Sequence, residues 1–238
     1  MTDLGTAPIH EGDPFSERVR EYSRQRPPGR IQMLEAGCGW GRGLALGDLR
    51  RHVTGVDLDL PALRARTLAR TDLDGWHLGD LRTVPLPPRE YDVVHAPYLI
   101  DRIPQAELVL DRLVAALKPG GLLLVRLRDR CTAYGLIDRM LPWWLRARLA
   151  AGDGVPPTAV YEPVASREGM RWYCVMRGLV VTEEYTSRKS VAAFGRWAAM
   201  VIWLGRMLAT LSGNRLPADH SEVMMVIRKP ENRFARVI

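Results

Sequence analysis

The sequence predicts an α/β protein: a mostly parallel, seven-stranded sheet with helices on both faces and an insertion after the fifth strand. Three observations support this fold class. Apolar runs alternate with amphipathic segments between residues 30 and 130, at the spacing of parallel strands joined by helices. Four glycines, at every second position from Gly37 to Gly43, follow the first apolar run. The 238 residues are 47% hydrophobic, which suits one domain with a single core.

Strands are expected where short apolar runs are bounded by turn residues. These runs cover residues 30–37, 53–60, 76–81, 91–98, 122–128, 179–187 and 222–229. Helices are expected where apolar residues recur with helical periodicity or proline occupies the first helical position, as Pro61 does. They cover residues 14–26, 61–70, 104–121 and 166–178, with a helical turn at 44–52 and a Pro-Gly-Gly turn that closes the third helix.

The net charge of +7 comes almost entirely from arginine, since lysine occurs only at positions 118, 189 and 229. These arginines alternate with acids, and no basic block with interleaved aromatic residues occurs, so we expect a solvated surface rather than a nucleic-acid footprint. No stretch approaches the roughly 20 apolar residues of a spanning helix, and the polar N-terminus is unlike a signal peptide. We therefore expect a soluble protein in the cytoplasm. The three cysteines are widely separated, so we expect reduced thiols and no metal site.

The glycine run at residues 37–43 is typical of a backbone that a ligand approaches closely. A phosphate loop requires a lysine, and none lies near these glycines. A dinucleotide fingerprint requires a third glycine where this chain has Arg42 or Leu44, depending on the starting glycine. What remains is an acid, Glu35, followed by alternating glycines, and a second acid, Asp57, at the end of the next strand.

Five segments in this order resemble the motifs of the class I S-adenosylmethionine-dependent methyltransferases, of the type that acts on small molecules. They are "LEAGCGWG", "GVDLD", "LGDL", "YDVVHAPYLIDRI" and "LKPGGLLLV". The resemblance implies a Rossmann-like fold with S-adenosylmethionine as cofactor. It divides a single domain, residues 1–238, into an N-terminal helix within 1–29, a cofactor-binding core at 30–130, and acceptor-side or cover elements at 131–165 and 188–215.

The resemblance also implies a cofactor site at the carboxyl ends of the first strands. Glu35 would lie near the methionine amino group of the cofactor, and Gly37 and Gly39 would let the cofactor pass close to the backbone. Asp57 would accept hydrogen bonds from both ribose hydroxyls, because an ionised carboxylate can receive two donors.

The adenine end and the methionyl end of the cofactor would be held by later segments. Asp80 would accept a hydrogen bond from the adenine amino group, while Leu58 and Leu81 would enclose the ring. Ala96, expected after the fourth strand, would offer its backbone to the methionyl part.

The candidate catalytic residues follow the fourth predicted strand. Methyl transfer from a sulfonium is an in-line displacement, so a base is needed chiefly for a hydroxyl or a protonated amine. Tyr98 lies at the strand exit, where members of the family meet their acceptors. Asp101 occupies a place where relatives carry a polar residue, although it also suits a cap of the following helix. His95, inside the apolar run, is expected to be a core histidine.

Aromatic residues in the variable segments, among them Trp143, Trp144 and Trp203, favour a small hydrophobic acceptor, methylated by default at oxygen. Two alternatives stay open: an RNA or other nucleic-acid methyltransferase, whose N-P-P-[YF] signature is missing here, and a non-catalytic cofactor-binding assembly module. The apolar segment 190–211 suits a cover of the sheet, a homodimer contact, a lid over the acceptor or a peripheral membrane contact.

Overall fold

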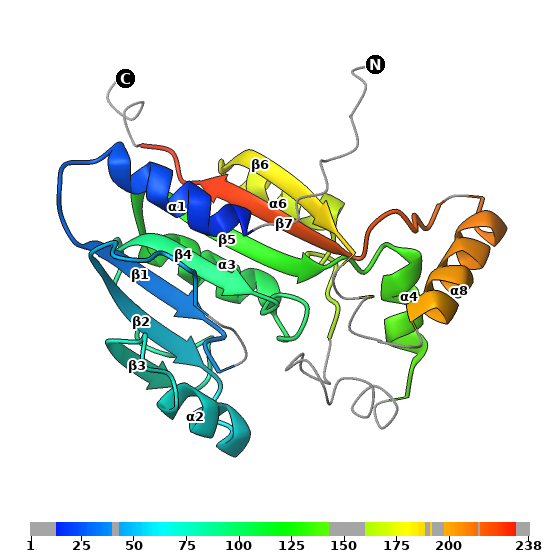
Figure 1. Cartoon of the computed structure of the whole chain (residues 1–238), viewed down its shortest axis with the longest axis horizontal. Helices are drawn as coiled ribbons and strands as arrows, with labels where there is room; N and C mark the ends of the chain where they lie inside the picture. The colour runs from blue at the N-terminus through cyan, green and yellow to red at the C-terminus, as the bar shows by residue number, and fades with distance from the viewer. Residues whose placement is uncertain are drawn as a thin grey trace.

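The computed structural model describes residues 13–39, 43–142, 160–188, 191, 198–213 and 215–231. A seven-stranded sheet in the order β3-β2-β1-β4-β5-β7-β6 forms its centre (Figure 1). The strands are β1 (Ile31–Ala36), β2 (Arg51–Asp57), β3 (Gly75–Leu78), β4 (Tyr91–Pro97), β5 (Leu117–Arg128), β6 (Val180–Ser187) and β7 (Glu222–Arg228). The first five strands run parallel and β7 runs antiparallel to both of its neighbours, which confirms the mostly parallel sheet.

The helices are α1 (Pro14–Arg24), α2 (Pro61–Leu68), α3 (Ala106–Ala116), α4 (Ala133–Met140), α6 (Arg167–Met176) and α8 (Ala198–Leu211). They cover both faces of the sheet, except α4 and α8, which pack together beyond the end of β5. Successive side chains of a strand point to opposite faces, so Met33 belongs to the core on the α1 side of the sheet, whereas Leu34 belongs to the core on the opposite side, which includes residues of α3 and α6. Figure 1 shows α1 crossing in front of the sheet.

The helical turn expected at residues 44–52 was wrong. Residues 43–50 form an irregular loop with one turn, and β2 begins at Arg51. Gly47 has a φ of +59°, a backbone conformation that ends a helix, and Leu46 is buried in the core beneath α1. The loop therefore gains its order from packing of its leucines and not from helical hydrogen bonds.

The helix expected at residues 104–121 is shorter than predicted. It begins at Ala106 and ends at Ala116, and the segment Leu117–Gly121 belongs to β5 instead of forming a closing turn. Proline at 119 cannot continue a helix, and the N–H of Gly120 donates to the carbonyl of Lys229, 2.8 Å away. The pairing of β4 with β5 shifts register here, so this segment is an irregular start of the strand.

The insertion after β5 contains α4, which the sequence period did not reveal. α8 packs against α4 and not on the sheet, and Figure 1 shows both helices beyond the carboxyl end of β5. The contact is close because Gly205 has no side chain: a Cβ there would lie 2.8 Å from the ring of Tyr134. Trp143 and Trp144 lie outside the described residues. Within the described part of the chain, no helix is long and apolar enough to cross a membrane.

Candidate active site

The glycine loop and Asp57 meet at the carboxyl ends of β1 and β2. The N–H of Gly39 donates to Oδ2 of Asp57 at 2.7 Å, and the N–H of Leu58 donates to Oδ1 at 2.7 Å. A Cβ at Gly39 would lie 2.9 Å from the carbonyl oxygen of Leu63, so no other residue fits without a shift of backbone. Gly37 has a φ of +85°, which also favours glycine.

Asp57 is buried at the end of β2, where the second strand was expected to place it. Burial raises the pKa of its carboxyl, and the hydrogen bonds from Gly39 and Leu58 oppose that shift. Each carboxylate oxygen accepts one backbone hydrogen bond and keeps a second lone pair. The geometry therefore suits the acceptance of two ribose hydroxyls, and this role stays a prediction.

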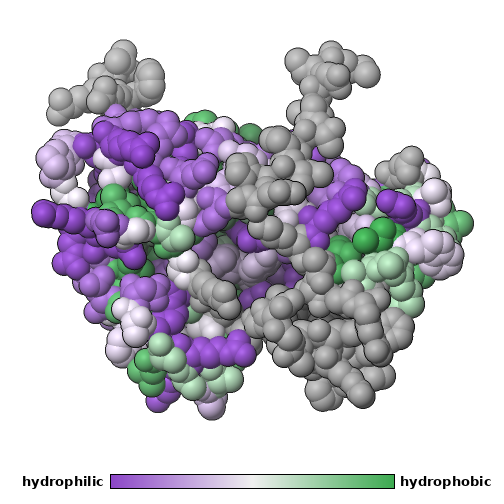
Figure 2. Space-filling model, viewed as in Figure 1, coloured by the Kyte–Doolittle hydropathy of each residue, from purple (hydrophilic) through white to green (hydrophobic). Residues whose placement is uncertain are grey.

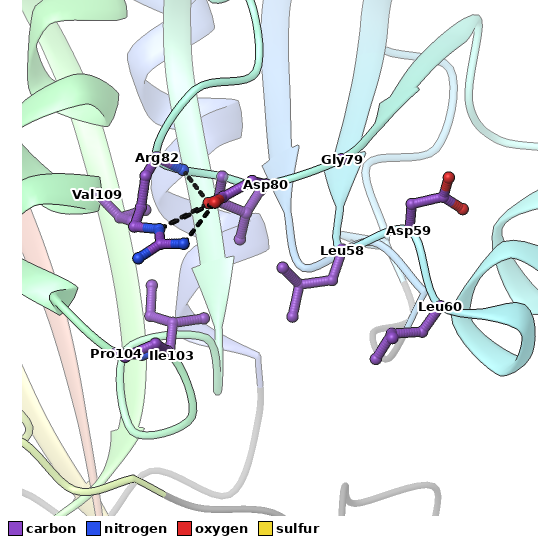
Figure 3. A pocket seen from close by; sticks show the side chains of 10 residues that line it. Leu58, Asp59, Leu60, Gly79, Asp80, Arg82, Ile103, Pro104 and Val109 are labelled. Atoms are coloured by element: carbon purple, nitrogen blue, oxygen red, sulfur yellow. Dashed lines mark hydrogen bonds and ion pairs between the residues drawn. The ribbon is translucent and has the colours of Figure 1, made fainter.

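A pocket of about 380 Å³ adjoins Asp57 at the ends of β2 and β3. Its walls come from three segments: Leu58, Asp59 and Leu60 after β2; Gly79, Asp80, Leu81 and Arg82 after β3; and Ile103, Pro104 and Val109 before and within α3. In the view of Figure 3, Leu58 lies between Ile103 and Leu60, so apolar side chains frame the space. The predicted adenine-side residues Leu58, Asp80 and Leu81 are thus brought together.

Asp80 lies two residues beyond the end of β3 and forms an ion pair with Arg82, with 2.6 Å between Oδ2 and the guanidinium. The hydrogen bonds from Arg82 lower the pKa of Asp80 to about 2. This carboxylate is therefore ionised at neutral pH and acts only as a hydrogen-bond acceptor, as contact with an amino group requires.

Sequence reasoning missed Arg70, which binds the glycine loop from the end of α2. Its Nη1 donates to the carbonyl of Cys38 at 2.9 Å and lies 3.3 Å from Oε1 of Glu35, while its Nε donates to Asp72. His95 completes the group, with Nδ1 3.1 Å from Oε2 of Glu35. Since Arg70 lies 35 positions from Glu35 in the chain, no local spacing pattern signals the contact.

These contacts refine two predictions. His95 is buried and bonded to Glu35, as expected of a core histidine. Glu35 is also buried and already contacts two nitrogen-bearing side chains, so a cofactor amino group would be a further partner rather than the first.

We expect Arg70→Met to weaken S-adenosylmethionine binding roughly threefold to tenfold. The change removes the hydrogen bonds from Arg70 to the carbonyl of Cys38 and to the carboxylate of Glu35, which shape the loop. Isothermal titration measures the effect. Arg177→Met is the control, since Arg177 also forms a paired contact, with Asp111 at 2.7 Å, but on the surface between α3 and α6. Equal affinities for the two variants would contradict a role for Arg70 in shaping the loop.

Ala96 lies inside β4, paired with Val125 of β5, and not after the strand as expected. The strand runs one residue further because Pro97 still pairs with Arg126. Ala96 therefore lies one residue before the end of the strand, and its contact with the methionyl part of the cofactor stays a prediction.

Tyr98 follows β4 with a φ of +51°, and its hydroxyl donates to Oε1 of Glu222 at 2.9 Å. The guanidinium of Arg126 lies 4.9 Å from the centre of the Tyr98 ring. Burial and the carboxylate of Glu222 raise the pKa of Tyr98, so the phenol stays protonated and acts as a hydrogen-bond donor.

Asp101 is fully buried, and neither carboxylate oxygen has a hydrogen-bond partner among the residues that the structure describes. Burial raises its pKa, against the attraction of Arg102 and Arg128. Asp101 does not cap α3: Glu162 accepts the hydrogen bonds from the N–H groups of Gln105 and Ala106 at the start of that helix. The capping alternative was therefore wrong, and within the described residues the carboxyl interacts with Arg102 and Arg128 through charge and without a hydrogen bond.

Within the described ranges, no three His, Cys, Asp or Glu side chains gather in a way that could hold a metal ion. The buried His220 instead lies between two carboxylates, 2.9 Å from Asp219 and 3.3 Å from Asp129, and these raise its pKa. This histidine therefore joins the end of β5 to the loop before β7.

Comparison with known protein families finds a match for the central segment of the chain. Residues 34–125, which contain β1 to β5 with the glycine loop, Asp57 and Asp80, match the family described as "Methyltransferase domain". The match assigns residues 34–125, and not the whole chain, to the class I S-adenosylmethionine-dependent methyltransferases. Members of this family use S-adenosylmethionine, and the loop and pocket described above occupy the matched segment.

A curated relative agrees with this methyltransferase domain. A "Probable S-adenosylmethionine-dependent methyltransferase" of Mycolicibacterium smegmatis is 35% identical over 117 residues, which are 49% of this chain and 45% of the relative. The match thus spans about half the length of each protein.

Solved structures share the fold of the methyltransferase domain at low sequence identity. An S-adenosylmethionine-dependent methyltransferase from Mesorhizobium loti is 15% identical, with a TM-score of 0.53 over 90% of this chain and 97% of that one. The [4+2]-cyclase SpnF is 16% identical, with a TM-score of 0.54 over 96% of this chain and 88% of that one. Because one of these proteins is named a cyclase, the fold alone does not assign the reaction.

Proposed function

We propose that the chain transfers the methyl group of S-adenosylmethionine to the oxygen of a small, hydrophobic organic acceptor. The observation that carries the proposal is the buried carboxyl of Asp101, which lies in the fourth of the motif segments and has no hydrogen-bond partner among the described residues. A buried carboxyl with a raised pKa is a candidate base for a hydroxyl acceptor.

The residues present fit S-adenosylmethionine. Gly39 leaves no room for a Cβ, Asp57 keeps two lone pairs, and the adjoining pocket is apolar with an ionised acceptor, Asp80, at its edge. We assign the adenine to this pocket, the ribose to Asp57 and the methionine end to the neighbourhood of Glu35. When bound, the cofactor supplies a methyl group that its sulfonium activates toward displacement.

The chain's own contribution is orientation, a dry site and a proton acceptor. In the proposed step, a bond forms between the acceptor oxygen and the methyl carbon, the carbon–sulfur bond breaks with its electron pair retained by sulfur, and the hydroxyl proton passes to Asp101. Tyr98 would hold the acceptor through its phenol. Because Asp101 is fully buried, an acceptor has to displace neighbouring side chains to reach it, and it then reacts away from water.

The hydrophobic character of the acceptor is supported by the residues around this carboxyl. Leu99, Ile100 and Ile103, in the same turn after β4, are all buried. The tryptophans on which the expectation first rested give less support: Trp143 and Trp144 lie outside the described residues, and Trp203 is exposed on α8.

A transfer assay with methyl-labelled S-adenosylmethionine tests the proposal. Hydroxylated aromatic, isoprenoid and glycosylated acceptors are compared with RNA and with protein, while isothermal titration compares the cofactor with a nicotinamide dinucleotide. Label in a small hydroxylated molecule supports the proposal. Label only in RNA favours the nucleic-acid alternative, and cofactor binding without any transfer favours the non-catalytic module.

We expect Tyr98→Phe to lower turnover about tenfold while cofactor affinity changes little, because the phenol acts on the acceptor side alone. Tyr173→Phe is a matched control, since its hydroxyl also donates to a carboxylate at 2.9 Å, that of Asp111, on the surface of α3. A similar loss of turnover in both variants would mean that the Tyr98 hydroxyl contributes only through stability.

A further inference from the structure

The outward face of α8 carries large apolar side chains, whereas its inward face carries small ones. Met200, Trp203, Met207 and Leu211 are 48%, 62%, 38% and 75% exposed. At 100° per residue they fall within an arc of about 80°. The buried residues Val201, Gly205 and Ala209 lie on the opposite side and pack toward α4. Figure 2 shows green and pale atoms at this right-hand edge of the molecule, where Figure 1 places α8.

This distribution is the reverse of an ordinary surface helix, which buries its large apolar residues. A continuous stripe that includes a tryptophan marks an interaction surface. Met140, at the end of α4, is 74% exposed and adds to the apolar surface of this pair of helices.

The charges beside the stripe indicate the partner. α8 contains one charged residue, Arg206, and no acid. Arg139 on α4 and Arg215 after α8 are exposed as well, and the exposed acid that follows, Asp219, is paired with His220. Among the described residues, none of these three arginines forms an ion pair with an acid. An apolar stripe with tryptophan and Arg206 on the same helix, and with further exposed cations on the adjoining segments, complements a lipid surface that carries negative headgroups.

A second exposed apolar patch, on α6, shows that exposed apolar residues alone do not indicate an anionic partner. On α6, Trp172 and Met176 are 67% and 61% exposed. This helix also carries the acid Glu168 in its first turn, and its arginines are paired: Arg171 with Glu184, and the adjoining Arg177 with Asp111. The α6 patch therefore lacks the excess of cations found beside α8.

We propose that the outward face of α8 docks on an anionic membrane surface, with Met200, Trp203, Met207 and Leu211 entering the headgroup region and Arg206 meeting lipid phosphates. This inference stands apart from methyl transfer, since it rests on α8 and α4 and not on the cofactor loop. A helix of this length, 14 residues, would lie in the interface and not span the bilayer.

The test uses the full chain and vesicles of phosphatidylcholine with or without phosphatidylglycerol, separated by sedimentation. We expect the chain to bind the mixed vesicles and to leave phosphatidylcholine alone largely unbound, with binding that weakens as salt is added. The double change Trp203→Ala and Met207→Ala should lower the partition constant at least about tenfold. Arg206→Gln should lower it roughly threefold to tenfold, and only for the anionic vesicles.

The matched control is Trp172→Ala with Met176→Ala, which removes the same residue types at the same spacing from α6. It should leave vesicle binding unchanged. Cofactor titration and thermal melting verify that all variants are folded. Absence of binding by the unmodified chain, or an equal loss in the α6 control, overturns the proposal. So does a stable dimer that the α8 change dissociates in a chain that binds no vesicles, because the stripe would then contact a second copy.

Discussion

Asp57→Ala is expected to lower the affinity for S-adenosylmethionine at least about tenfold. Two hydroxyl donors of the ribose would lose an ionised acceptor, and hydrogen bonds to charged groups contribute roughly 1.5–3 kcal/mol each. The same change leaves the buried N–H groups of Gly39 and Leu58 without their present acceptor. The unliganded chain should therefore also lose roughly 1–3 kcal/mol of unfolding free energy.

Asp74→Ala is the control that separates the loss of cofactor affinity from the loss of stability. Asp74 lies at the opposite end of β2, where its Oδ2 accepts the N–H of Val53 at 2.7 Å. Its removal should destabilise the chain and leave cofactor affinity unchanged. Isothermal titration gives the affinities, and denaturant unfolding gives the stabilities. If Asp57→Ala weakened the cofactor no more than Asp74→Ala does, Asp57 would be a structural residue only.

Asp101→Asn is expected to reduce methyl transfer by at least about a hundredfold, because a positioned base contributes roughly 10²–10⁴ to the rate. Cofactor affinity should be unchanged, since the proposed role of Asp101 is toward the acceptor and not the cofactor. The side chain keeps its size, so the loss reports on proton acceptance rather than on packing. Single-turnover assays with whichever acceptor the transfer assay labels measure the loss.

The same variant has a pH signature. Burial raises the folded-state pKa of Asp101 above its unfolded value near 4, so the folded chain holds this proton more tightly. The corresponding stabilisation is present below the unfolded pKa and is lost as pH rises through the folded pKa. In that window the unfolding free energy of the original chain should fall by about 1.4 kcal/mol per pH unit relative to Asp101→Asn.

Asp92→Asn is the control for this pH dependence. Asp92 is also buried and lies near the start of β4, the strand that precedes Asp101, but Arg26 and Lys118 pair with it, and it accepts the N–H of Gln32. Its replacement should destabilise the chain, because those partners lose their counter-charge. An unchanged pH dependence in Asp101→Asn, together with full turnover, would remove Asp101 from the proposed mechanism.

Local sequence patterns were sufficient for much of the fold and for the centre of the cofactor site. Short apolar runs bounded by turn residues predicted all seven strands. The signal was plainest for a central strand such as β4, which is buried on both faces and needs consecutive apolar residues, whereas the edge strands β3 and β6 are partly exposed. Asp57 was expected at the end of the second strand and lies there, and glycine is required at residue 39 by the Leu63 carbonyl 2.9 Å from its Cβ position.

Tertiary structure alone decided where distant side chains meet and which of them lack a partner. Arg70 contacts Glu35 across 35 positions. Glu162, from a segment far along the chain, caps α3 in place of Asp101, whose carboxyl has no hydrogen-bond partner in the described part of the chain. Similarly, α8, the described end of the apolar segment, turns its large residues outward because Gly205 lets its small face approach Tyr134. The periodicity of a segment predicts its own secondary structure. The partners of its side chains and the face that it exposes depend on which segments the folded chain brings together.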